Sequence, residues 1–199
     1  MRIEAFLKSI ETIPNRWVRL DSASETRSGL ELIFSVHRGK RGRRLQAWAI
    51  SCLEVREKHL TDFGGGGLRI YSGSHPAARQ YLARQAELRW RRNDRAAEIL
   101  GALYTAHLQA VADWIPFDRY TGTRYTLIRI TSAKRPVIRG PAFLLRAYAN
   151  TLCNHAGDVK LVLRPVPAVK SDRLKVLHFG ESYVVAKSFI ARPEPRPNA

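Results

Sequence analysis

The chain has 199 residues, of which 45% are hydrophobic and 26% are charged, and its formal net charge is +17. The first two proportions are ordinary for a globular protein that is long enough to bury a substantial core. No segment approaches the roughly 18 consecutive apolar residues of a membrane-spanning helix, and residues 1–14 are too charged for a signal peptide, so the sequence predicts neither.

The charge balance is the unusual property of this composition. Lysine and arginine number 34 against 17 aspartate and glutamate residues. A GC-rich genome would favour arginine over lysine, but it does not explain an excess of basic over acidic residues. A positive field of this size attracts phosphates and accelerates encounters with polyanions. We therefore expect a nucleic acid as partner, with an acidic protein partner or a merely solubilising basic surface as alternatives.

The two cysteines, Cys52 and Cys153, both lie in apolar stretches, and the sequence has no CxxC pair. Isolated cysteines in such surroundings behave as small hydrophobic residues. We expect both thiols to be reduced core residues of a cytoplasmic protein. Cysteine–histidine pairs at zinc spacing do not occur, and we expect neither a metal nor another cofactor.

The amino-terminal third predicts a short helix followed by an antiparallel sheet. In residues 3–13 apolar side chains recur at helical spacing, and Pro14 follows them. From Trp17 to Tyr71 the chain is rich in β-branched and aromatic residues, which favour strands. The predicted strands cover residues 17–20, 30–37, 45–55 and 68–73.

The loop between the second and third predicted strands is strongly basic. Gly39 and Gly42 allow positive φ angles in a hairpin loop. Like charges this close repel one another unless an anion or a nearby acid offsets them. We predict that the loop contacts phosphate, with a solvated loop as the alternative. Its cations are Arg38, Lys40, Arg41, Arg43 and Arg44.

Four consecutive glycines, Gly64 to Gly67, precede the strand at residues 68–73. They match no phosphate-binding glycine motif and are expected to form a flexible connection. Residues 76–92 then predict a helix with Pro76 in its first turn. Few acids oppose its arginines, so we predict a basic ridge with an aromatic ring for base stacking. The ridge consists of Arg84, Arg89, Trp90, Arg91, Arg92 and Arg95.

Residues 94–115 carry the clearest helical periodicity of the chain. Their apolar residues form one stripe, Asn93 and Asp94 offer N-cap oxygens, and Pro116 follows the segment. We expect this helix to be the centre of the packed core. His107 lies on the apolar stripe and is expected to be a hydrogen-bonded core residue, not a ligand.

Residues 124–165 predict a βαβ unit with its helix at 141–156. Gly140 and Pro141 suit the start of this helix, and Gly157 suits the left-handed residue after its end. Helix N-termini attract anions through their dipole and their exposed N–H groups. We predict an anion site at this helix start, formed with Lys134, Arg135 and Arg139.

The end of the chain predicts a hairpin that turns at Gly180 and Glu181, followed by a Pro-rich disordered tail over residues 192–199. The predicted fold class is α+β, with an N-terminal antiparallel sheet, two central helices and a C-terminal βαβ unit plus hairpin. We expect residues 1–191 to form a single domain, in which lobes 1–92 and 93–191 share the helix at 94–115.

Side chains suited to acid–base or metal chemistry are present but form no complete motif. Carboxylates and an imidazole near a strand end are compatible with metal-assisted phosphodiester cleavage; they are Glu54, Glu57, His59 and Asp62. Asp158 and Lys160 match the short D-x-K element of restriction-type nucleases. His75, near the glycines, is a candidate for metal-independent RNA cleavage. Whether the protein is an enzyme stays open.

The sequence therefore predicts a basic, non-enzymatic protein of nucleic-acid binding or nucleoprotein assembly. Its three basic segments would contact mainly phosphates, because arginine binds phosphate bidentately and no base-reading module is apparent. A small nuclease and a scaffold subunit that binds an acidic protein are the alternatives. The pattern does not distinguish DNA from RNA.

Overall fold

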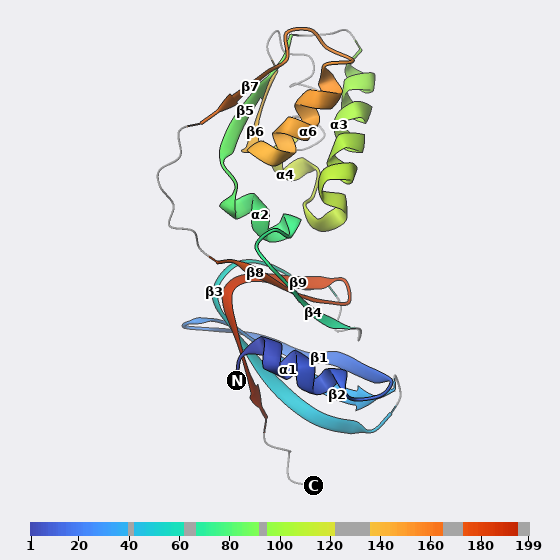
Figure 1. Ribbon diagram of the computed structural model, residues 1–199, viewed down its shortest axis with the longest axis vertical. Coiled ribbons are helices and arrows are strands. Elements are labelled where there is room, and N and C mark those ends of the chain that lie inside the picture. Colours follow the sequence, from blue (N-terminus) through green and yellow to red (C-terminus); the bar gives the residue numbers. More distant parts are fainter. Residues whose placement is uncertain (40–41, 62–66, 92–94, 122–135, 165–172, 195–199) are drawn as a thin grey trace. The chain divides into compact units, whose positions relative to one another are not determined.

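The computed structural model describes residues 1–39, 42–61, 67–91, 95–121, 136–164 and 173–194 (Figure 1). The fold is α+β, as the sequence predicts. The chain divides into two compact units. Unit 1 comprises Met1–Ala78 and Asp172–Ala199, and unit 2 comprises Arg79–Ser171. Within the described residues, no helix is long and apolar enough to cross a membrane.

Unit 1 is built on a six-stranded sheet in the order β1-β2-β3-β9-β8-β4. All neighbouring strands are antiparallel. The predicted sheet and the hairpin turn at Gly180 and Glu181 are confirmed, and the last strand extends into the segment expected to be a tail. The strands are β1 (Arg16–Thr26), β2 (Gly29–Arg38), β3 (Arg44–His59), β4 (Leu68–Tyr71), β8 (Lys175–Phe179) and β9 (Ser182–Pro193).

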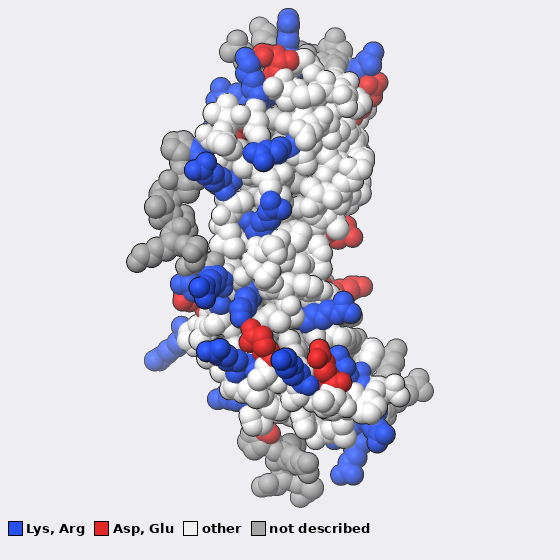
Figure 2. Space-filling model, in the orientation of Figure 1, with Lys and Arg blue, Asp and Glu red and all other residues white. Residues whose placement is uncertain are grey.

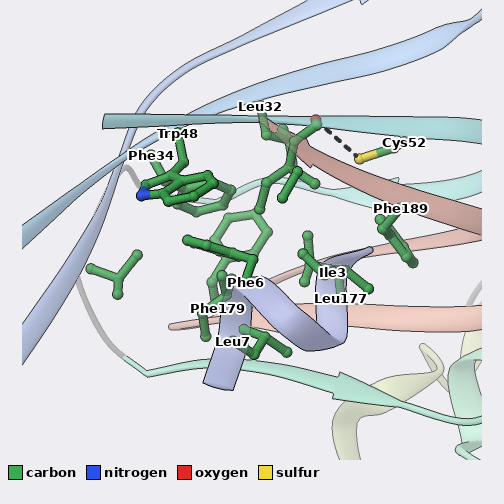
Figure 3. Packing of buried hydrophobic residues seen from close by; sticks show 14 of the residues in the cluster. Ile3, Phe6, Leu7, Leu32, Phe34, Trp48, Cys52, Leu177, Phe179 and Phe189 are labelled. Carbon is green, nitrogen blue, oxygen red and sulfur yellow. Dashed lines mark hydrogen bonds between the residues drawn. The ribbon is translucent and has the colours of Figure 1, made fainter. Parts of the chain in front are cut away.

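The helix predicted near the N-terminus is α1 (Ile3–Glu11), and it packs against this sheet. Figure 3 shows Phe6 pointing from α1 into the cluster formed by Phe34, Trp48 and Phe179. The rings of Phe6 and Trp48 lie 4.7 Å apart. Burial of each large apolar side chain contributes about 1.5–3 kcal/mol. Packing therefore stabilises α1, which is too short to be stable alone.

Unit 2 contains a three-stranded sheet in the order β6-β5-β7. Since β6 and β7 are each antiparallel to β5, they run parallel to one another, and β5 lies between the two strands of the βαβ unit. The elements are α2 (Pro76–Leu82), which begins in unit 1, β5 (Gln85–Arg89), α3 (Ala96–Val111), η1 (Ala112–Trp114), α4 (Asp118–Thr121), β6 (Val137–Pro141), α6 (Ala142–Leu152) and β7 (Lys160–Leu163).

The predicted helix at 94–115 exists as α3, but α6 is the centre of the core of unit 2. Figure 1 shows α6 between the sheet and α3, and its contacts are with β5, β6, β7 and α3. The outer side of α3 leaves Tyr104 and Leu108 exposed. The proposed N-cap residues Asn93 and Asp94 lie outside the described residues. The apolar stripe thus predicted the helix correctly, but α3 lies on the outside of unit 2 and not at the centre of its core.

His107 is a hydrogen-bonded core residue, as predicted. Its Nε2 donates to the carbonyl oxygen of Ile115 at 2.6 Å, so its Nδ1 accepts from the hydroxyl of Tyr148 at 2.8 Å. Burial lowers the pKa of His107. The neutral ring thereby joins α3 to α6.

The helix predicted over residues 76–92 is wrong in its second half. The helix α2 ends at Leu82, and β5 follows it. In β5, Ala86 and Leu88 are buried, whereas Gln85 and Arg89 are exposed. These residues have good helix propensity, but pairing with strands on both sides stabilises the extended conformation.

The βαβ unit differs in detail from the prediction. Its first strand is β6, whereas residues 124–131 lie outside the described residues. The helix α6 ends at Leu152, which leaves Cys153 exposed and not in the core. Asp158, with φ 53°, and not Gly157, adopts the left-handed conformation after this helix. The helix was predicted to extend beyond Leu152, and this error explains why Cys153 was wrongly predicted to be buried.

Candidate functional site

The sheet of unit 2 has one face packed on α6 and a second face that carries charged side chains. Side chains of a strand alternate between faces, so those between the buried Ala86 and Leu88 lie on the second face. There Glu87 is directly opposed by Arg139 on β6 and by Val162 on β7. We call this surface the outer face; it consists of Gln85, Glu87, Arg89, Val137, Arg139, Lys160, Val162 and Arg164.

Glu87 is the centre of the outer face. Its Oε1 accepts a hydrogen bond from Nε of Arg89 at 2.5 Å. Its Oε2 accepts hydrogen bonds from Arg139 at 3.0 Å and from Arg164 at 2.9 Å. These arginines lie on β5, on β6 and directly after β7, so one carboxylate orients side chains from all three strands. Only 7% of the Glu87 side chain is exposed, because the arginines themselves cover it.

The electrostatics of this cluster leave a surplus of positive charge. Hydrogen bonds from Arg164 and Arg89 lower the pKa of Glu87 to about 2, so the carboxylate is ionised at neutral pH. One negative charge thus faces three positive charges. The side chains of Arg89, Arg139 and Arg164 are 56%, 66% and 45% exposed. Each guanidinium has five N–H donors, and Glu87 occupies one or two of them. The three guanidinium groups therefore have further N–H donors beyond those that Glu87 occupies.

In the view of Figure 2, the described cations of unit 2 lie mainly over its sheet. Lys160 adds a further cation to the outer face, and its Nζ also pairs with Asp158 at 3.0 Å. Figure 2 shows lysine and arginine side chains over the side of unit 2 where β5 and β7 lie, whereas the side over α3 is largely uncharged. Between its ends, α3 carries one acidic residue, Glu98, and no lysine or arginine.

The predicted basic ridge does not form a single helical surface. Arg89 belongs to the outer face, but Trp90 is 2% exposed and packs in the core of unit 2, so it cannot stack on a base. The strand alternation of β5 directs the two residues to opposite faces. Of the remaining members, Arg84 lies before β5, Arg91 lies after it and Arg95 lies before α3, whereas Arg92 lies outside the described residues.

Of the anion site predicted at the start of a helix, only Arg139 is among the described residues. Arg139 lies in β6 and binds Glu87 on the face of the sheet opposite α6. The helix α6 begins at Ala142 without a side-chain cap. The other two residues of this prediction, Lys134 and Arg135, lie outside the described residues. Arg139 is thus a member of the outer-face cluster.

The basic loop between β2 and β3 is held by hydrogen bonds in its described part. Nδ1 of His37 donates to the carbonyl oxygen of Gly42 at 3.1 Å. The amide of Gly39, which has the predicted positive φ, donates to the carbonyl oxygen of Asn15 at 2.6 Å. Three cations of the loop are described, and all three are exposed: Arg38, Arg43 and Arg44. The other two, Lys40 and Arg41, lie outside the described residues.

Arg44 of this loop forms an ion pair with an acidic residue, which offsets part of the repulsion between the cations of the loop. Arg44 pairs with Asp21 at 3.5 Å. The same carboxylate accepts hydrogen bonds from Arg19 at 3.0 Å and from Ser35 at 2.9 Å. Arg19, Asp21 and Arg44 border an open cavity of about 440 Å³. Unit 1 therefore contains a second carboxylate that orients exposed arginines.

The groups considered for nuclease chemistry form structural pairs. Glu54 pairs with Lys187 at 2.7 Å, and Glu57 accepts a hydrogen bond from the hydroxyl of Tyr183 at 3.2 Å. His59 stacks on Tyr183 with ring centres 5.5 Å apart, and Asp62 lies outside the described residues. Among the residues whose placement is described, no three His, Cys, Asp or Glu side chains are arranged to hold a metal ion.

The sequence pattern did not identify Glu87, Arg164 and Lys160 as members of one site. Alternation over residues 85–90 was the signal for a strand there, but the helix propensity of these residues concealed it. The pairing of Glu87 with Arg164, 77 residues away, has no local signal.

Comparisons with protein families, with curated proteins and with solved structures found no match. The function is therefore inferred from the residues of this chain alone.

Proposed function

We propose that the protein binds nucleic acid through the outer face of unit 2, mainly by contacts to backbone phosphates and without catalysing a reaction. The observation that carries this proposal is the convergence of three exposed guanidinium groups on one nearly buried carboxylate. Arginine is well suited to phosphate because its planar group donates two parallel hydrogen bonds.

Glu87 supports phosphate binding by orienting the arginines in advance. A solvated arginine loses about 2 kcal/mol of rotamer entropy when it is fixed, and this loss weakens binding. Arg89, Arg139 and Arg164 are already hydrogen-bonded to Glu87 in the folded protein. Part of their rotamer entropy is therefore lost on folding and not on binding.

The chemistry of the outer face favours contacts that do not depend on base sequence. Its polar groups are mostly cations, which recognise phosphates and not base edges. Val162, 49% exposed, offers an apolar contact for a sugar or base. The loop with Arg38, Arg43 and Arg44 supplies further exposed cations on unit 1. The expected binding is therefore strongly salt-dependent and weakly sequence-dependent.

The test is the affinity for a labelled single-stranded oligonucleotide, measured by fluorescence anisotropy. We expect the double variant Arg139→Gln/Arg164→Gln to bind at least about a hundredfold more weakly at low salt, because each charged hydrogen bond contributes about 1.5–3 kcal/mol. The matched control is Arg27→Gln/Arg146→Gln. It removes the same charge from an exposed turn of unit 1 and from the exposed side of α6, and it should lose less than about threefold.

Two further measurements separate binding from folding and from other partners. Thermal unfolding of each variant shows whether the cluster variant remains folded at the assay temperature. The variant Arg139→Lys/Arg164→Lys keeps the charge but loses the planar donors, and we expect an intermediate affinity. Equal losses for the cluster and control variants would refute the proposal. So would the absence of oligonucleotide binding, and co-purification of an acidic protein would then favour a protein partner.

A further inference from the structure

A second set of basic side chains lies on unit 1, on the face of its sheet opposite α1. Strand register places Arg69 on β4 beside His178 on β8, and His178 beside Tyr183 on β9. Residues opposed in this way share a face of the sheet. The neighbouring Leu177 and Val184 are on the other face, within the core that contains α1. The row Arg69–His178–Tyr183 is thus separated from the hydrophobic core.

A tyrosine ring joins this row to a second histidine. Tyr71 follows Arg69 by two residues on β4 and therefore lies on the same face. Its ring stacks on His75 with centroids 4.6 Å apart and an angle of 28°, and it lies 6.1 Å from the ring of His178. Both histidines are partly exposed. Two imidazoles thus lie beside the Tyr71 ring, and Arg69 lies on the same face of the sheet.

The environment of the two histidines opposes their protonation. Desolvation, followed by the charge of His178, lowers the pKa of His75. Desolvation, and to a smaller extent the charge of Arg69, lowers the pKa of His178, while the carbonyl of Gly180 acts in the opposite direction. Repulsion among three basic groups marks a place where an anion would be stabilised.

Among the described residues, β3 and β9 contribute further titratable groups to this face. His59 is opposed to Tyr183, and Glu57 accepts the hydrogen bond of the Tyr183 hydroxyl. Glu57 is therefore engaged by a group other than the two histidines. For both His75 and His178, the largest cause of the lowered pKa is desolvation and not a neighbouring carboxylate.

We propose that Arg69, His75 and His178 form a phosphate-binding site that takes up protons when it binds a phosphate of the nucleic acid. Arg69 supplies a permanent charge, and each imidazole supplies a further positive charge when it is protonated. The identity of the ligand rests on the proposed function, whereas the residues and their unit are different.

The sign of the pH dependence follows from linkage. A bound phosphate stabilises the imidazolium form, so the pKa of each histidine is higher in the complex than in the unliganded protein. Affinity then increases as the pH falls from the pKa of the complex towards that of the unliganded protein. A rise of one pKa unit at one histidine corresponds to a tenfold gain in affinity.

The experiment measures binding of a labelled oligothymidylate between pH 8 and pH 5.5, where its backbone charge is constant. We expect the affinity of the wild type to rise by up to about a hundredfold, which corresponds to a one-unit shift at each histidine. The variant His75→Gln/His178→Gln should lose most of this rise, whereas the control His155→Gln, exposed in unit 2, should retain it. An equal rise in the wild type and the double variant would overturn the proposal.

A second arm distinguishes this proposal from the proposed function. The ring signals of the histidines are followed by NMR while sulfate, a dianion throughout this pH range, is added. Selective shifts of His75 and His178 support the anion site even if no oligonucleotide binds, a result that would refute the proposed function alone. Equal shifts of all the histidines, or none at these two, would overturn the site. The site and the outer face are therefore tested separately.

Discussion

At the scale of single residues, burial followed from the local pattern only where the element itself was predicted correctly. Cys52 lies in a predicted strand and is fully buried, and His107 lies on a predicted helical stripe and is hydrogen-bonded in the core. Cys153 was assigned to the core by the same reasoning, but α6 ends one residue earlier. Beyond that point the helical period no longer determines which side chains are buried.

The two cysteines should therefore differ strongly in reactivity. Burial raises the pKa of the Cys52 thiol to about 12, whereas Cys153 is exposed. Because the thiolate is the reactive form, we expect iodoacetamide at pH 8 to modify Cys153 alone in the folded protein and both residues in guanidinium chloride. Peptide mass spectrometry identifies the site, and Cys153→Ser serves as the control. Modification of Cys52 at a comparable rate under native conditions would show that this strand is not buried as described.

At the scale of secondary-structure elements, long periodic segments were predictable and short ones were not. The stripes of α1 and α3 gave both helices within a few residues. The five residues of β5 are too few for the period to outweigh their helix propensity, and their extended conformation depends on β6 and β7, which come later in the chain. The outer face could not be foreseen for the same reason.

The cluster around Glu87 should stabilise unit 2 in a pH-dependent manner. Its pKa falls from the ordinary 4.5 to about 2 on folding. The contribution is therefore fully present above about pH 4.5 and is lost as the pH falls towards 2. We expect Glu87→Gln to lower the thermal midpoint at pH 7 and to match the wild type near pH 2. The control is Glu98→Gln, an exposed position of α3. A midpoint difference that did not shrink on acidification would contradict this role.

At the scale of the whole molecule, the charge surplus was evident from composition, but its distribution was not. Pairing of β3 with β9 joins Trp48 to Pro193, and Glu87 binds arginines 52 and 77 residues away. Contacts of this range leave no local signal in a single sequence. Composition thus gave the class of partner that we propose, while the fold determined which cations act together.

The dependence of oligonucleotide affinity on salt concentration tests the outer face most directly. For single strands the slope of log affinity against log salt is about −0.7 for each phosphate neutralised. We predict that Arg139→Gln/Arg164→Gln makes the slope shallower by about 1.4 relative to the wild type, since two phosphate contacts are lost. The control Arg27→Gln/Arg146→Gln should keep the wild-type slope. Identical slopes for the wild type and the cluster variant would contradict phosphate binding at the outer face.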